Sequence, residues 1–166
     1  MRADGAKRAA FLQVARMLNE GFGVEPLLFG SLGLEERLDR SLDADDVDVL
    51  VPERLLREAW PMLSRAMAAL GYALYDDSEH AFERDGVSVA FASLESLGPF
   101  AGVDISRIPI VEEKGARYGL LTLPDYLRVY EASSKDGYRK NVKHKQDERK
   151  IVLIRKALDE AKGIRT

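Results

Sequence analysis

The sequence predicts a mixed α/β fold of the α+β type: a mixed sheet of about five strands flanked by helices, with a C-terminal helical segment. The first observation is that short apolar runs with strand-like alternation are interleaved with segments whose apolar residues recur at helical spacing. The second is the length of 166 residues, which suits one domain with its own core. The third is that no repeat or low-complexity segment divides the chain. We therefore expect one domain over residues 1–166, with an α/β core over 1–121 and C-terminal helices over 122–166.

The first half of the chain alternates between helical and strand-like segments. Apolar residues on one face predict a first helix, which ends near Gly21. The run PLLFGS predicts a short buried strand that turns at Gly30 and Ser31 into a short helix, LGLEERLDR. The run VDVLVP predicts the second strand. The helical run ERLLREAWPMLSRAMAALG contains Pro61, which must either kink the helix or begin a new one.

The second half begins with strands. The runs YALYDD, HAFERDG and VSVAFAS predict three of them, and the last two form a hairpin that turns at Asp85 and Gly86. Residues 94–102 contain a Gly-Pro pair and are expected to form a loop. A further hairpin is expected to turn at Lys114 and Gly115.

Helices close the chain. One begins at TLPDYL, where Thr122 and Asp125 have the spacing of a capping box. A long basic helix is expected from about Asn141 to Lys162. Its basic cluster is either a solvated face or a contact for phosphate or RNA. The cluster comprises Lys135, Arg139, Lys140, Lys143, Lys145, Arg149 and Lys150.

Composition excludes several kinds of protein. Cysteine is absent, which rules out disulfides, thiolate metal sites and a cysteine nucleophile. No apolar run is long enough to span a bilayer, and the N-terminal residues have the spacing of an amphipathic helix rather than of a signal peptide. The net charge of −3 disfavours a general nucleic-acid coat protein. We expect a cytoplasmic protein with no membrane partner.

The candidate site lies where the first two predicted strands meet their turns. Asp46 and Asp48 are two residues apart, so on a strand they share one face, while valines fill the other. Two carboxylates about 6–7 Å apart can together hold a hard cation such as Mg²⁺. Gly30 and Ser31 precede a helix, whose free backbone N–H groups suit phosphate. Together these residues predict a magnesium–nucleotide site.

Other interpretations of these residues remain open. Asp45, Asp46 and Asp48 also fit a solvated strand entrance or part of a turn. A calcium loop is disfavoured, because DADDVD lacks the glycine and the distal glutamate of an EF-hand. The two histidines, His80 and His144, have no metal-ligand spacing.

A strand, a Gly-Ser pair, a short helix and then DVDV on the next strand resemble the signature of the nucleotidyltransferase superfamily, which has the polymerase-beta-like fold. The C-terminal KHKQDERKIVLIRKAL is similar to the closing helix of small prokaryotic members, including those paired with toxins or antitoxins. The resemblance covers about residues 27–158. It implies transfer of a nucleoside monophosphate from a nucleoside triphosphate to an acceptor hydroxyl on a protein, an RNA or a small alcohol.

The resemblance also implies roles for residues and metal. An active member would use Mg²⁺, two ions of it, held by the carboxylates, which would be both metal ligands and catalytic residues. We further expect basic residues of the last helix to neutralise the triphosphate. The candidate residues are Asp46 and Asp48 for metal and catalysis, and Gly30, Ser31, Lys143 and Lys145 for nucleotide and phosphate.

One position departs from the family pattern. Active members carry a third carboxylate on a neighbouring strand, and the matching strand here is VSVAFAS. Its Val89 faces one side, so Ala90 faces the aspartate pair, where the acid is expected. Loss of a general base lowers a rate by roughly 10²–10⁴. Acids nearby in the sequence could substitute for it: Glu83, Asp85, Glu95 and Asp104.

Three hypotheses follow from the sequence. The chain is a magnesium-dependent nucleotidyltransferase, or a degenerate member that binds a nucleotide or a protein partner without transfer, or an RNA-binding module that acts through its basic helix. A third carboxylate within reach of Asp46 and Asp48 would favour the enzyme.

Overall fold

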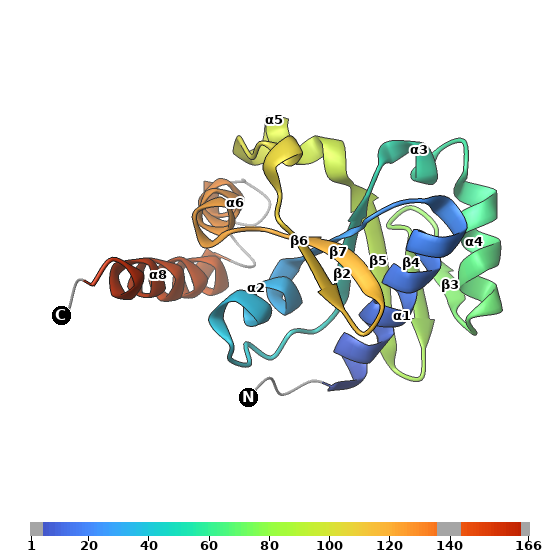
Figure 1. Ribbon diagram of the computed structural model, residues 1–166, viewed down its shortest axis with the longest axis horizontal. Coiled ribbons are helices and arrows are strands. Elements are labelled where there is room, and N and C mark those ends of the chain that lie inside the picture. The colour runs from blue at the N-terminus through green and yellow to red at the C-terminus, as the bar shows by residue number, and fades with distance from the viewer. Residues whose placement is uncertain (1–4, 136–143, 164–166) are drawn as a thin grey trace. The chain divides into compact units, whose positions relative to one another are not determined.

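Figure 1 shows the computed structural model, which describes residues 5–135 and 144–163. Its contacts divide the chain into two compact units. Unit 1 comprises Met1–Glu95 and Ile108–Leu121, and unit 2 comprises Ser96–Arg107 and Thr122–Thr166. The single domain expected from the length of the chain stays a prediction.

Unit 1 is built on one mixed sheet with the strand order β3-β4-β5-β2-β1-β7-β6. Strands β2 and β5 are parallel, as are β1 and β7, and the other neighbours are antiparallel. The mixed sheet confirms the predicted fold class, with seven strands among the described residues rather than about five. Its elements are α1 (Gly5–Phe22), β1 (Leu27–Phe29), α2 (Gly30–Leu38), β2 (Val47–Val51), α3 (Glu53–Leu56), α4 (Trp60–Ala69), β3 (Ala73–Asp76), β4 (Ala81–Arg84), β5 (Val87–Ser93), β6 (Ile110–Glu113) and β7 (Ala116–Leu120).

The centre of the sheet confirms that PLLFGS and DVDVLV form adjacent strands joined by a helix. Strand β1 pairs antiparallel with β2, and α2 connects them. In this register Phe29 lies opposite Asp48. On the other side of β2, the parallel strand β5 places Ala90 next to Asp48.

Helices cover one face of this sheet. Val47, Val49 and Phe91 are buried on the face of β2 and β5 that packs against α1 and α4. Figure 1 shows α1 crossing the sheet. Each such side chain contributes about 1.5–3 kcal/mol by its removal from water, so register errors in β2 are strongly disfavoured. The opposite face of the same strands carries Asp48 and Ala90, which are only half-buried.

Both predicted hairpins are confirmed, because their turns have the backbone that the sequence implies. Asp85 and Gly86 have φ of 51° and 80°, and Lys114 and Gly115 have φ of 50° and 82°. A tight two-residue hairpin turn has the left-handed conformation at both central residues, and Asp-Gly is one of the pairs that favour such a turn.

Two expectations about helices had different outcomes. Pro61 stands in the first turn of α4, so it begins a new helix rather than kinking a long one. The loop expected over residues 94–102 is wrong, because Leu94–Ser96 forms a 3-10 turn and α5 (Leu97–Ala101) follows it. Pro99 falls within the first turn of α5, where its missing N–H has no helical acceptor to lose.

Unit 2 contains α5, a 3-10 turn at Ile105–Arg107, α6 (Leu123–Lys135) and α8 (His144–Ala161). The backbone N–H of Asp125 donates to the Thr122 hydroxyl at 3.3 Å, as the capping spacing predicts. Between α6 and α8, the buried Ser133 hydroxyl donates to Asp147 at 3.0 Å. The predicted start of the basic helix at about Asn141 lies outside the described residues. No helix of the described part of the chain is long and apolar enough to cross a membrane.

Candidate functional site

The start of α2 lies directly against Asp48. Gly30 has φ of 65°, and a Cβ atom built on it would lie 3.2 Å from Cγ of Asp48 and overlap the carboxylate. Only glycine combines this left-handed backbone with such a close approach. The structure therefore brings together two of the predicted site residues that are 18 positions apart in sequence (48 − 30).

The first turn of α2 is a candidate site for an anion. Its N-cap residue, Phe29, makes no side-chain cap hydrogen bond within the described residues, and the first turn contains no acidic residue. Ser31 is half-buried at this end of the helix. Backbone N–H groups at a helix N-terminus attract negative charge, which the Asp48 carboxylate against Gly30 or a phosphate group can supply.

The two predicted metal ligands are placed differently. Asp48 is half-buried within β2, whereas Asp46 is exposed in the bend that leads into the strand. Because β2 begins at Val47, the strand alternation that was expected to put both carboxylates on one face does not extend to Asp46. That the two carboxylates hold one cation together stays a prediction.

Glu35 is a residue of this region that the sequence reasoning missed. It lies in α2 and is only 1% exposed. Its Oε2 atom accepts the backbone N–H groups of Leu42 at 3.0 Å and Ala44 at 3.2 Å. Both belong to the loop that leads to Asp46. The one sequence signal was its helical spacing from the apolar Leu32, an unusual place for a glutamate.

The third carboxylate of the family pattern has no counterpart beside Asp48. Ala90 occupies the adjacent position on β5, as the alternation of VSVAFAS predicted. Among the described residues, no group of three or more His, Cys, Asp or Glu side chains could hold a metal ion. This part of the chain therefore offers the aspartate pair alone.

Three of the acids named as substitutes accept backbone hydrogen bonds elsewhere in the structure. Glu83 accepts the Gly86 N–H at 2.6 Å, and both oxygens of Glu95 accept the Glu53 N–H at 3.2 Å. Asp104 accepts the Ser106 hydroxyl and N–H, and these hydrogen bonds lower the pKa of its carboxyl. Glu83, Glu95 and Asp104 thus each have a structural partner, and Asp85 stands in the turn of the β4–β5 hairpin.

The donor set fits one Mg²⁺ ion and not two. Mg²⁺ is commonly held by one or two carboxylates, with phosphate oxygens and water filling the octahedron. Asp46, Asp48 and a phosphate at the start of α2 match that pattern. A second ion would need the carboxylate that Ala90 replaces.

The predicted phosphate-binding lysines cannot be placed. Lys143 lies outside the described residues, as does the side chain of Lys145. Their contribution to phosphate binding stays a prediction.

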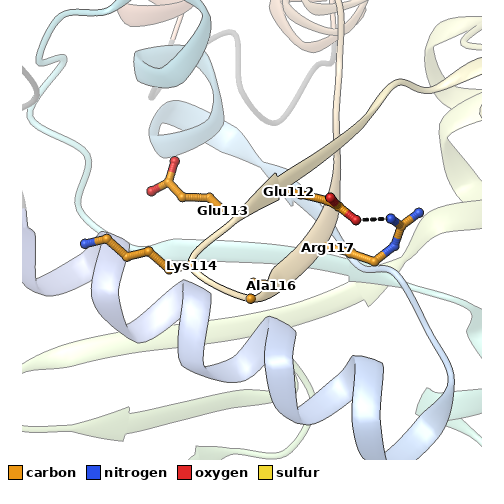
Figure 2. Close-up of a pocket in the computed structure, with 6 residues that line it drawn as sticks. Glu112, Glu113, Lys114, Ala116 and Arg117 are labelled. Carbon is orange, nitrogen blue, oxygen red and sulfur yellow. Dashed lines mark hydrogen bonds and ion pairs between the residues drawn. The ribbon is translucent and has the colours of Figure 1, made fainter.

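A cavity of about 290 Å³ lies at the tip of the β6–β7 hairpin, over residues 112–117 (Figure 2). Glu112 pairs with Arg117 across it, and Glu25 pairs with the same arginine at 2.6 Å. The hydrogen bond to Glu25 raises the pKa of the Arg117 guanidinium most, and that to Glu112 raises it further. Glu113 pairs with Arg8. The cavity contains no predicted site residue, and three of its charged residues, Glu112, Glu113 and Arg117, form ion pairs within the protein.

The chain matches no known protein-family model. It is 38% identical over 148 residues to the uncharacterized protein YnaI of Bacillus subtilis (strain 168), a match that covers 89% of this chain and 95% of that protein.

Solved structures with the same fold include the antibiotic-resistance factor ANT(2'')-Ia. Its solution structure matches 94% of this chain and 93% of its own, with 13% identity and a TM-score of 0.54. Its crystal structure in complex with adenylyl-2''-tobramycin covers 93% and 91%, with 14% identity and a TM-score of 0.55. An antigenic nucleotidyltransferase-like protein from Paracoccidioides brasiliensis covers 90% of this chain and 76% of its own, with 14% identity and a TM-score of 0.58. The fold is therefore nucleotidyltransferase-like, as the resemblance implied.

Proposed function

Since the chain belongs to the same family as Bacillus subtilis YnaI and has a nucleotidyltransferase-like fold, we propose that it binds a magnesium–nucleoside triphosphate and transfers its nucleoside monophosphate to an acceptor hydroxyl. The observation that carries the proposal is the contact between Gly30 and Asp48. It sets a helix N-terminus, which favours phosphate, beside a carboxylate, which favours a divalent cation.

Each residue of the site has a distinct task in this proposal. The backbone N–H groups at Gly30 and Ser31 bind the phosphates and orient the triphosphate. Asp46 and Asp48 hold Mg²⁺. When bound, the ion neutralises the triphosphate and polarises the reacting phosphorus. Without it, the two carboxylates would repel the phosphates, so nucleotide binding should depend on the metal.

The proposed transfer forms one bond and breaks one. The oxygen of the acceptor hydroxyl bonds to the α-phosphorus, and the bond from that phosphorus to the oxygen bridging to the β-phosphate breaks. Pyrophosphate leaves with the electron pair, and the hydroxyl proton passes to the solvent. The acceptor class that we propose to test first is a small alcohol, because the ANT(2'')-Ia crystal structure holds adenylyl-2''-tobramycin.

Ala90 favours a second candidate function, binding of the nucleotide without transfer. Its methyl group stands next to Asp48, where a third carboxylate would prepare the attacking hydroxyl. A degenerate member would use the bound nucleotide as a ligand, for instance to control association with a protein partner. Binding is common to both candidates, and only transfer separates them.

The test is calorimetric titration of the full chain with ATP, CTP, GTP and UTP, each with and without Mg²⁺. We expect one of them to bind only in the presence of Mg²⁺. The double variant Asp46→Asn, Asp48→Asn should lose this binding and keep its fold, with slightly higher stability because like-charge repulsion is relieved. Release of pyrophosphate with added alcohols then separates transfer from binding alone.

The matched control is Asp39→Asn, Asp43→Asn. These residues carry the same charges, are exposed, and have φ of 51° and 54°, which asparagine tolerates. The control should bind nucleotide as the wild type does. Binding that survives in the Asp46, Asp48 variant would place the site elsewhere.

A further inference from the structure

Glu35 joins the two halves of the proposed site through the backbone. It belongs to α2, the helix whose first turn faces Asp48, and it lies five residues after Gly30 (35 − 30). Its Oε2 atom accepts two N–H groups from the loop between α2 and β2, at Leu42 and at Ala44. One buried carboxylate oxygen thus connects the phosphate-facing helix to the segment that delivers Asp46.

Within the described residues, the other restraints on this loop are local. Most residues from 39 to 46 are half-buried or exposed, and Ala44 is the buried exception. Within the loop, the Ser41 hydroxyl accepts the Asp43 N–H at 3.3 Å. At its start, the backbone N–H groups of Asp39 and Arg40 donate to the Glu35 carbonyl oxygen, which is again a local restraint. A loop whose restraints are so local moves readily unless it is tied to a rigid element. Glu35 supplies that tie from within a helix.

We propose that Glu35 is a positioning residue for the metal site: it fixes the loop so that Asp46 reaches the cation held by Asp48. This inference rests on the proposed function. Glu35 does not touch the nucleotide or the metal in this proposal. It raises the fraction of molecules in which Asp46 is correctly placed before the nucleotide arrives, and apparent affinity scales with that fraction.

Arg37, two residues after Glu35 in α2, provides a matched comparison for the Glu35 contacts. Arg37 donates Nε to the carbonyl oxygen of Leu121 at 2.7 Å and Nη2 to that of Leu120 at 3.0 Å. It therefore also makes two hydrogen bonds from α2 to backbone groups, but toward the end of β7 rather than toward the loop. Removing Arg37 should loosen the helix without releasing Leu42 and Ala44.

The experiment compares Glu35→Ala, Glu35→Gln and Arg37→Ala in the full chain. Amide exchange of Leu42 and Ala44 is measured by NMR without ligand, and affinity is measured with MgATP, MgCTP, MgGTP and MgUTP. Glu35→Ala should speed the exchange of both amides. It should also lower the affinity for the nucleotide that binds about tenfold, if the loop is then correctly placed in about a tenth of the molecules. Glu35→Gln keeps an acceptor oxygen and should bind within about twofold of the wild type. Arg37→Ala should leave the two amides protected.

The outcomes separate the two proposals. If the wild type binds none of the four nucleotides, the proposed function fails, and the positioning inference fails with it. If the wild type binds but Glu35→Ala binds equally well, the positioning inference alone is overturned. The same follows if Glu35→Ala leaves the exchange of Leu42 and Ala44 unchanged, or if Arg37→Ala weakens binding as strongly.

Discussion

At the scale of single residues, the site depends on a glycine and an alanine as much as on its carboxylates. Gly30 allows the start of α2 to reach Asp48, and a side chain there would overlap the carboxylate. Ala90 fills the position beside Asp48 with a methyl group instead of an acid. Both positions follow from local patterns in the sequence, a Gly-Ser turn and strict alternation along VSVAFAS. Glu35 does not, because its partners are backbone groups of a loop that no periodicity describes.

Ala90→Asp tests whether the missing acid limits the chemistry. Adjacent strands lie about 4.8 Å apart, so the new carboxylate would stand beside that of Asp48. Without metal, the added like charge should lower the free energy of unfolding by about 1 kcal/mol at most. With Mg²⁺, three carboxylates should bind the ion more tightly and increase pyrophosphate release from the triphosphate. Thermal unfolding with and without Mg²⁺ and an assay for pyrophosphate check both effects.

Ala92→Asp is the control for that change. Ala92 is exposed on the same strand and pairs with Leu50 rather than with an aspartate. The variant carries the same added charge two residues further along β5. If both variants respond equally to Mg²⁺, the effect is general electrostatics, and Ala90 is not the position of a lost ligand.

At the scale of elements, segments with their own local signal could be predicted from the sequence, and segments defined by distant partners could not. The Asp-Gly and Lys-Gly turns fix two hairpins through backbone conformation alone. The short α5 was missed because a Gly-Pro pair is typical of loops, although proline is tolerated in a first helical turn. The sheet has seven strands rather than about five because the β6–β7 hairpin joins it through the pairing of β7 with β1. In that pairing Leu27 lies opposite Gly119, and hydrophobic periodicity does not identify partners 92 residues apart (119 − 27).

The connection from α4 to β3 gives a stability prediction. Arg84 donates to the Leu70 carbonyl and to Gln13, both at 2.8 Å, and its guanidinium lies 4.4 Å from the centre of the Tyr72 ring. The Tyr72 hydroxyl is buried with no hydrogen-bond partner among the described residues. Tyr72→Phe keeps the ring beneath Arg84 and removes an unsatisfied group, so at pH 7 it should leave stability unchanged or raise it by about 1 kcal/mol. Urea unfolding measures this.

The same variant has a pH signature. Burial raises the pKa of the Tyr72 hydroxyl, with a smaller contribution from Asp85 and an opposing one from Arg84. A raised pKa means that the folded state keeps its proton longer, so this contribution to stability is complete below about pH 10 and is lost as the pH rises further. Tyr72→Phe should therefore lose less stability than the wild type above about pH 10. A destabilised variant at pH 7 would show instead that the hydroxyl has a partner.

At the scale of the whole molecule, the proposed nucleotide site and the basic helix belong to different units. Gly30, Asp46 and Asp48 lie in unit 1, whereas α8 lies in unit 2. The fold of the chain could be predicted from one short motif, the strand with its Gly-Ser pair, the short helix and the DVDV strand, because these elements form the centre of the sheet. The activity could not, since the same fold at 13–14% identity does not fix an acceptor. The basic helix therefore needs a test that separates nucleotide binding from RNA binding.

The double variant Lys143→Ala, Lys145→Ala provides that test. If these lysines bind the triphosphate, each contact contributes about 1 kcal/mol, so nucleotide affinity should fall roughly ten- to thirtyfold, with a weaker dependence on salt. Thermal stability should hardly change. Calorimetry with the nucleotide that binds, and fluorescence anisotropy with a short RNA, are compared at about 50 and 200 mM salt, where counterion release separates the two ligands most clearly.

The control Lys156→Ala, Lys162→Ala removes two exposed charges from the same end of the chain. Unchanged nucleotide affinity with lost RNA binding would favour an RNA-binding module, and no effect on either ligand would leave the basic cluster as a solvated face.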